Sequence, residues 1–226
     1  MWKACLVPHV LDEIGRRLLA AVPSGRRALV AVDGADGTGK TTFASGLASA
    51  IHNRPVVVLH ADDYLNPSSV RHARGRHSPE GFWLDSYNYD ALRSYALHPL
   101  GADGGGWYRP ASYDSTRDAT IRPEVVRVDR DTIVLVEGIF LHRDELVSLW
   151  DYSIYLHAPF TETARRMAVR DGSNPDPEHP SIRRYVDGQR LYFAQAAPWR
   201  RASLVVNNTS FDHPMVMDPA EIADGP

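Results

Sequence analysis

A glycine-rich loop constrains the fold of this chain more than any other segment. Residues 34–41 read Gly-Ala-Asp-Gly-Thr-Gly-Lys-Thr, match G-x-x-x-x-G-K-[ST] in full, and directly follow the apolar residues 29–32. The glycines allow successive backbone N–H groups to point at one anion, and the helix expected from about residue 41 presents its positive end to that anion. The motif therefore predicts a phosphate-binding loop between a buried strand and a helix.

Side chains at the end of this loop predict what it does with the phosphates. Lys40 is expected to reach the β- and γ-phosphates of a nucleotide, and the hydroxyl of Thr41 to bind Mg²⁺. The candidate nucleotide-binding residues are Gly34, Ala35, Asp36, Gly37, Thr38, Gly39, Lys40, Thr41 and Thr42.

The 226 residues suit one domain, which we expect over residues 1–214, with an amphipathic helix within 1–26 and a frayed tail at 215–226. The single cysteine excludes an intrachain disulfide and fits a reducing cytoplasm. A net charge of −3 without charge blocks argues against nucleic acid as a partner. No apolar run approaches the roughly 20 residues that span a bilayer, so no membrane association is expected either. The sequence leaves a homo-oligomer open.

The hydrophobic pattern alternates between strand and helix periods, which is typical of an α/β fold with a mostly parallel sheet covered on both faces. Five strands are expected, at residues 29–33, 55–60, 132–136, 152–156 and 203–206. Residues 65–128 are expected to form an acceptor-binding loop and a small β flap. Residues 171–182 are expected to form a lid, and Ser181 to cap the helix that follows it.

Carboxylates stand where two of these strands end, beside the glycine loop that follows the first strand, and ligands of open parallel sheets bind at that edge. Asp62 and Asp63 follow the second strand, and Glu137 ends the third. Asp62 could accept the proton of an attacking hydroxyl and approach the metal, while Glu137 could face the metal. Turn or capping roles are the alternatives for these residues.

Three segments besides the glycine loop carry a family resemblance. They are His-Ala-Asp-Asp-Tyr at 60–64, Val-Glu-Gly-Ile-Phe at 136–140 and the arginine-containing helix at 164–171. With the loop, they resemble the uridine kinase and phosphoribulokinase group of P-loop kinases over roughly residues 28–208. The resemblance implies a three-layer P-loop NTPase fold and transfer of phosphate from ATP, with Mg²⁺, to a primary hydroxyl of a small acceptor.

The resemblance also implies roles for individual residues. Asp62 would be the base and a magnesium neighbour, and Glu137 a second acid beside the metal. Asp85 is the nearest match to the aspartate that holds ribose hydroxyls, and Tyr113 to the flap residue over a nucleobase. Catalytic roles fall to Asp62, Lys40, Arg166 and Arg170, the last two as lid arginines. The expected acceptor-binding set is Asp62, Asp63, Tyr64, Asp85, Tyr113 and Arg166.

The acceptor stays open between several classes, with the 5′-hydroxyl of uridine or cytidine favoured. The arginines at 71, 74 and 76 would suit a sugar phosphate such as ribulose 5-phosphate. The Asp36-Gly37 pair is similar to thymidylate kinases, which act on a nucleotide, but adjacent carboxylates at 62–63 would repel a phosphorylated acceptor. Asp-Asp followed by an aromatic resembles nicotinamide riboside kinases, whose acceptor is cationic. A nucleotide-dependent switch without an acceptor is the alternative of another class.

Overall fold

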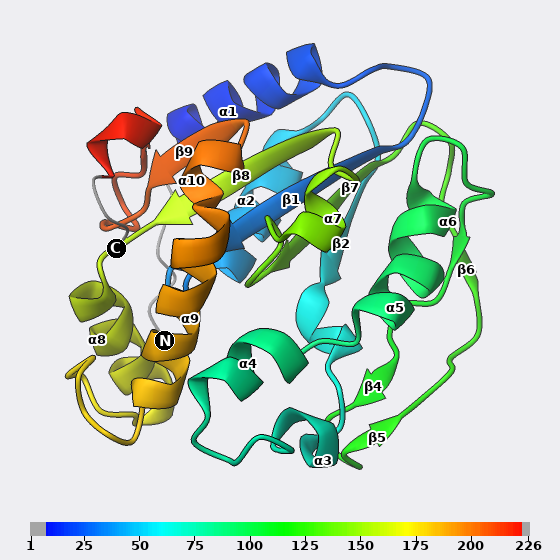
Figure 1. Cartoon of the computed structure of the whole chain (residues 1–226). Helices are drawn as coiled ribbons and strands as arrows, with labels where there is room; N and C mark the ends of the chain where they lie inside the picture. Colours follow the sequence, from blue (N-terminus) through cyan, green and yellow to red (C-terminus); the bar gives the residue numbers. More distant parts are fainter. Residues whose placement is uncertain (1–7, 223–226) are drawn as a thin grey trace.

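A six-stranded sheet forms the centre of the computed structural model, which describes residues 8–222 (Figure 1). The strand order is β10-β9-β8-β1-β7-β2, and all neighbours are parallel except β10 and β9. The bounds are β1 Ala28–Gly34, β2 Val56–His60, β7 Ile133–Gly138, β8 Tyr152–His157, β9 Leu204–Asn207 and β10 Met215–Met217. The five expected parallel strands are confirmed. The strands β1 and β7 are buried along their whole length, and their sequences are apolar up to Asp33 and Glu137 near their carboxyl ends.

Helices cover both faces of the sheet and make three layers (Figure 1). On one face, α1 (Pro8–Ala21) packs on α2 (Lys40–Ala50), and both bury their apolar sides against β1. On the other face, α4 (Pro79–Asp85) packs on α9 (Arg183–Ala196) around a group of aromatic rings centred on Phe140. The remaining α-helices on this side are α7 Asp144–Val147, α8 Phe160–Asp171 and α10 Pro198–Arg201.

The long connection between β2 and β7 contains more regular structure than the sequence indicated. Its helical pieces are η1 Ala61–Tyr64, α3 Ser68–Arg71, α4, α5 Tyr89–Ala91, η2 Leu92–Leu97 and α6 His98–Leu100. Two short ladders make the expected flap, in which β3 (Trp107–Tyr108) pairs with β6 (Val126–Arg127) and β4 (Tyr113–Asp114) with β5 (Ala119–Thr120). The flap lies beside the carboxyl edge of β2 because Ser112 donates its N–H to the carbonyl of Asp63.

Two local expectations were wrong. Ser181 does not cap α9, since Ile182 occupies the cap position and makes no side-chain bond there. The segment after Pro214 is not a frayed tail over its described part: β10 pairs with β9, and η3 (Pro219–Glu221) begins with a capping box at Asp218. Cys5 and the rest of residues 1–7 lie outside the described residues. Between residues 8 and 222, no helix has both the length and the apolar character that crossing a bilayer requires.

Candidate active site

The glycine loop joins β1 to α2 with a backbone that only glycine accommodates at two points. Gly37 and Gly39 have φ angles of 79° and 90°, in the left-handed region. A Cβ at Gly37 would lie 2.6 Å from the carbonyl oxygen of Thr163 on α8. Gly39 is the N-cap of α2, so the positive end of that helix faces the loop. The expected strand, loop and helix are all present.

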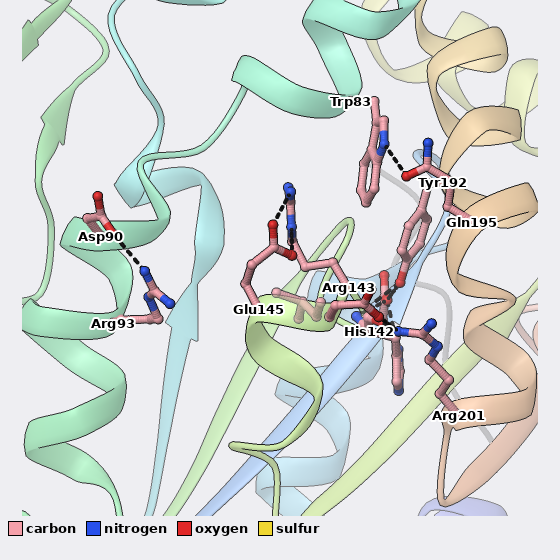
Figure 2. Close-up of polar contacts among 12 residues, drawn as sticks. Trp83, Asp90, Arg93, His142, Arg143, Glu145, Tyr192, Gln195 and Arg201 are labelled. Carbon is pink, nitrogen blue, oxygen red and sulfur yellow. Dashed lines mark hydrogen bonds and ion pairs between the residues drawn. The ribbon is translucent and has the colours of Figure 1, made fainter.

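A buried carboxylate holds the start of the loop. Asp33 accepts hydrogen bonds from the backbone N–H of Gly34 at 2.7 Å and from Nδ1 of His142 at 2.8 Å. The hydroxyl of Tyr192 also donates to this carboxylate, and Figure 2 shows Tyr192 and His142 directed toward one another. Burial alone raises the pKa of Asp33, but the bonds and charge of His142 and the bond from Tyr192 outweigh it, so the net shift is downward.

The ammonium of Lys40 lies inside the loop. Its Nζ donates to the carbonyl of Ala35 at 3.0 Å, and the hydroxyl of Thr38 donates to the same oxygen at 2.8 Å. Lys40 is buried, and its ammonium lies against the backbone of the loop. This is the position from which it can reach phosphates that lie on those amides.

Three elements bring oxygen and nitrogen groups together beside the loop. The hydroxyl of Thr41, on α2, donates to Oε1 of Glu137 at 3.0 Å. Nδ1 of His60 lies 2.6 Å from the same oxygen, because His60 stands opposite Glu137 in the parallel pairing of β2 and β7. No group of three or more metal-binding side chains occurs among residues 8–222. Hydroxyl and carboxylate oxygens in so small a set fit Mg²⁺, which keeps waters and phosphate oxygens as its other ligands.

The two aspartates after β2 lie on η1 and are exposed. Asp62 is oriented by Tyr87, whose hydroxyl donates to its Oδ1 at 2.7 Å. Desolvation raises the pKa of Asp63; His60 opposes this shift, while the charges of Asp62 and Glu137 add to it. Asp62 and Asp63 after β2 and Glu137 near the end of β7 thus form one group of negative charge at the carboxyl edge of the sheet.

The two candidate arginines of α8 have different surroundings. The guanidinium of Arg166 lies 3.7 Å from the ring of Phe211, measured to the ring centre, and donates to the carbonyls of Asn208 and Thr209 at 2.9 and 2.8 Å. It also pairs with Glu162 at 2.7 Å, so its donors are largely occupied. Arg170 pairs with Asp171 at 2.8 Å and stays exposed, and it lines a cavity of about 860 Å³ between the glycine loop and the lid.

Comparisons with known proteins agree with this geometry, although no protein-family model matches the chain. A uridine kinase from Brevibacillus brevis is 27% identical over 154 residues, which cover 65% of this chain and 67% of that protein. Nicotinamide riboside kinase 1 from Homo sapiens is 24% identical over 149 residues, covering 66% and 67%.

Solved structures share the fold. One described as a possible uridine kinase from Bacillus stearothermophilus has a TM-score of 0.67 at 21% identity and covers 86% of this chain and 96% of that one. Phosphoribulokinase from Rhodobacter sphaeroides has a TM-score of 0.56 at 13% identity, covering 81% and 71%. The chain is thus similar in sequence to kinases of small alcohols, and its fold is that of the uridine kinase and phosphoribulokinase-like P-loop kinases. It is therefore a phosphotransferase with an alcohol group as acceptor.

Several expected acceptor residues of this kinase have other partners. Tyr64 has no exposed surface and donates its hydroxyl to the carbonyl of Arg109, so it cannot contact an acceptor in this conformation. Tyr113 is also buried, and its hydroxyl donates to Asp118 at 2.8 Å. Asp85 pairs with Arg74 at 2.8 Å. We therefore leave Tyr64 out of the proposed site, whereas Asp85 and Tyr113 stay predictions.

The arginines of the long connection do not form the free cationic cluster that a sugar phosphate would need. Arg71 donates to the carbonyl of Asn66 at 2.7 Å and to the hydroxyl of Tyr113 at 3.1 Å. Arg74 is neutralised by Asp85. Arg76 contributes its carbonyl oxygen to Arg184 at 2.8 Å. Two of these three arginines thus have side-chain partners that stabilise the fold.

The structure also adds residues of the kinase site that the sequence did not indicate. They are Asp33, His60, Tyr87, Gln189 and Asn208, whose side chains contact the glycine loop or one of the site carboxylates. The position of His60 at the end of a strand was the only available signal. Asp33 contacts the adjacent Gly34, whereas the contacts of Tyr87, Gln189 and Asn208 join segments between 25 and 170 positions apart, which no local pattern reveals.

Proposed function

We propose that this kinase transfers the γ-phosphoryl group of ATP to a primary hydroxyl of a small, nucleoside-like acceptor, with the 5′-hydroxyl of uridine or cytidine favoured. The observation that carries the proposal is the meeting of the glycine loop, Glu137 and Asp62 at one edge of the sheet. Phosphoryl transfer needs a phosphate cradle, a metal position and an oriented hydroxyl, and these residues supply all three. The single cysteine of the sequence favours a reducing, cytoplasmic location.

Each residue has a defined part in the proposed reaction. Backbone amides of residues 37–42 and the ammonium of Lys40 bind the phosphates. Asp62 accepts the proton of the attacking hydroxyl and holds that hydroxyl in line with the γ-phosphate. Thr41 and Glu137 would hold Mg²⁺, which would supply positive charge to neutralise the phosphate oxygens. Arg170, exposed at the cavity, neutralises charge on the transferred group.

We propose a structural role for Arg166 in place of the catalytic and acceptor-binding roles expected from the sequence. Its guanidinium is committed to Glu162 and to the carbonyls of the segment after β9, and lies 3.4 Å from the carbonyl oxygen of Gly37. We assign it to holding that segment against the glycine loop. Its effect on ATP would then be indirect.

A cationic acceptor such as nicotinamide riboside is the second candidate. The pair Asp62 and Asp63 favours it, because two exposed carboxylates would attract positive charge and repel a phosphorylated acceptor. The partnered arginines described above give no support to a sugar phosphate. Uridine and nicotinamide riboside share a ribose with a free 5′-hydroxyl, so one assay can compare them.

The test is product identification by mass spectrometry after incubation of the enzyme with ATP, Mg²⁺ and a library of nucleosides, sugars and sugar phosphates. We expect one nucleoside-like acceptor to gain one phosphate, and Asp62→Asn to lower this turnover by roughly 10²–10⁴-fold. The control is Asp90→Asn, on an aspartate whose side chain is 91% exposed. ATP binding without any phosphorylated product would instead support the nucleotide-dependent switch.

A further inference from the structure

A second cavity, of about 390 Å³, lies at the end of the sheet opposite the glycine loop. Three arginines line it: Arg27, which immediately precedes β1, and Arg127 and Arg130, which precede β7 in the chain. The glycine-rich residues 102–105 form another wall. The glycine loop of the kinase site follows the other end of β1, and none of the groups assigned to phosphoryl transfer lines this cavity.

Arg27 is a buried cation without a carboxylate partner. The residue is 5% exposed, and its Nη2 donates to the carbonyl of Gly104. Its Nε is buried without a hydrogen-bond partner, and within residues 8–222 no carboxylate pairs with its guanidinium, whereas the adjacent Arg26 pairs with Asp151 at 2.7 Å. A buried charge that lacks a counterion is costly. An anion in the cavity would lower this cost.

The two other arginines add positive charge that is also free. Arg127 and Arg130 are exposed, and neither makes an ion pair with a carboxylate in the part of the chain that the structure describes. The carboxylate of Asp131, next to Arg130 in the chain, pairs instead with Arg54 at 3.0 Å. Among the described residues, Asp103 is the one acidic residue that lines the cavity. Three arginines against one aspartate leave an excess of two positive charges.

An exposed aromatic ring stands at the edge of this cavity. Trp107 lies opposite Arg127 in the antiparallel pairing of β3 and β6, and the guanidinium lies 5.8 Å from the centre of its ring. A Cβ at Gly105, a lining residue, would lie 4.0 Å from Cδ1 of the same indole. The fluorescence of Trp107 should therefore respond to a ligand that binds Arg127.

The chemistry of the lining fits a phosphate group. Guanidinium groups bind phosphate and carboxylate through forked, charge-assisted hydrogen bonds. A phosphate monoester carries close to two negative charges at pH 7 and presents three acceptor oxygens, whereas a carboxylate carries one charge. The phosphate therefore matches the excess charge of the cavity. The volume of about 390 Å³ is also in the range of small-molecule sites.

We propose that this cavity binds the phosphate group of a small molecule at a second site, with Arg27, Arg127 and Arg130 as the donors. The site is separated from the glycine loop by the seven residues of β1, roughly 20 Å of extended chain. That separation is too large for direct transfer of a phosphoryl group, so the bound molecule is an effector and not a substrate. The inference does not rest on the proposed function.

Calorimetric titration with pyrophosphate distinguishes the two phosphate sites, in the absence of nucleotide and of Mg²⁺, which would bind the probe. We expect the wild type to bind two equivalents, and Lys40→Ala to lose the one at the glycine loop. In the Lys40→Ala background, Arg127→Gln or Arg130→Gln should weaken the remaining equivalent by about 10-fold or more. Asp103→Asn should strengthen it roughly 2- to 5-fold. Trp107→Phe should abolish the fluorescence change but keep the binding heat.

Arg122→Gln is the matched control, because Arg122 is an exposed arginine of the same connection that does not line the cavity. It should leave the affinity within about 2-fold, since exposed charges at a distance are screened. Thermal unfolding verifies that each variant folds. The inference is overturned if the wild type binds one equivalent that Lys40→Ala abolishes, if Arg127→Gln and Arg130→Gln change nothing, or if Arg122→Gln weakens binding equally. Each of these results leaves the proposed function standing.

Discussion

The carboxylate of Asp33 and Nδ1 of His142 lie 2.8 Å apart, and neither side chain has any exposed surface. Asp33 is the residue before the glycine loop, and His142 follows the turn after β7 that carries Glu137. Tyr192 of α9 donates to the same carboxylate. Three elements that are distant in the sequence therefore position the phosphate-binding backbone through one buried group.

Removal of the charge at this point should destabilise the kinase. In the variant Asp33→Asn, an NH₂ group takes the place of one carboxylate oxygen. This NH₂ group is a donor that faces other donors, so buried polar groups lose their hydrogen-bond partner. We expect the free energy of unfolding to fall by about 2–3 kcal/mol. Urea unfolding at pH 7 measures this change, and the exposed Asp90→Asn should stay within about 0.5 kcal/mol of the wild type.

The same pair predicts a pH dependence. Because the pKa of Asp33 is lowered in the folded protein, its contribution is fully present above the ordinary aspartate pKa of about 3.9 and is lost as the pH falls through the folded-state value. The stability difference between wild type and Asp33→Asn should therefore be constant from pH 7 to 5 and shrink below about pH 4. A difference that persists unchanged in acid would show that the charge of Asp33 contributes nothing.

The contact between Thr41 and Glu137 predicts a shared effect on Mg²⁺. Replacement of either group, by Thr41→Val or Glu137→Gln, should raise the Mg²⁺ concentration for half-maximal turnover by roughly 10–100-fold. Thr41→Ser keeps the hydroxyl and should remain near the wild type. The rate of ADP release, measured as a function of Mg²⁺ concentration, checks this prediction. Equal Mg²⁺ dependence for Thr41→Val and Thr41→Ser would show that the hydroxyl of residue 41 does not contribute to Mg²⁺ binding.

The hydrogen bond from Tyr87 to Asp62 predicts a defect in turnover. Tyr87→Phe leaves the ring in place but frees the carboxylate to rotate, and bonds to charged groups contribute about 1.5–3 kcal/mol. We expect kcat to fall roughly 10-fold, with the ATP KM unchanged. Tyr95→Phe is the matched control, on the neighbouring helical segment. An equal loss in both variants would assign the effect to packing.

Two neighbouring arginines of α8, Arg166 and Arg165, are expected to differ in their importance for nucleotide affinity. Arg166→Ala should detach the segment after β9 from the loop and raise the ATP KM roughly 10-fold, and Arg166→Lys should restore little because an ammonium cannot make the forked contacts. Arg165→Ala removes only an exposed pair with Glu162 and should change stability by less than about 1 kcal/mol. Nucleotide titration monitored by Trp fluorescence compares the three. The same affinity for Arg166→Ala and Arg165→Ala would contradict this assignment.

Much of the architecture could be predicted from sequence, because the glycine loop and the apolar strands are local patterns. The position of Glu137 beside Thr41 also followed from the rule that parallel strands end at one edge. The partners of the site side chains could not be predicted. Tyr64 is buried and Arg166 is occupied because of packing between distant segments, and no periodicity in either segment records those contacts.

The strand β10, which the sequence did not indicate, has a consequence for how the site is completed. The segment between β9 and β10 supplies Asn208, whose side-chain amide donates to the carbonyl of Thr38 at 2.6 Å across 170 positions of the chain, and Phe211, whose ring lies against Gly39. During synthesis on the ribosome, the glycine loop emerges early but gains these supports only after β9 has been made. A chain that ends before residue 208 therefore has the glycine loop without the contacts from Asn208 and Phe211 that hold it in the folded protein.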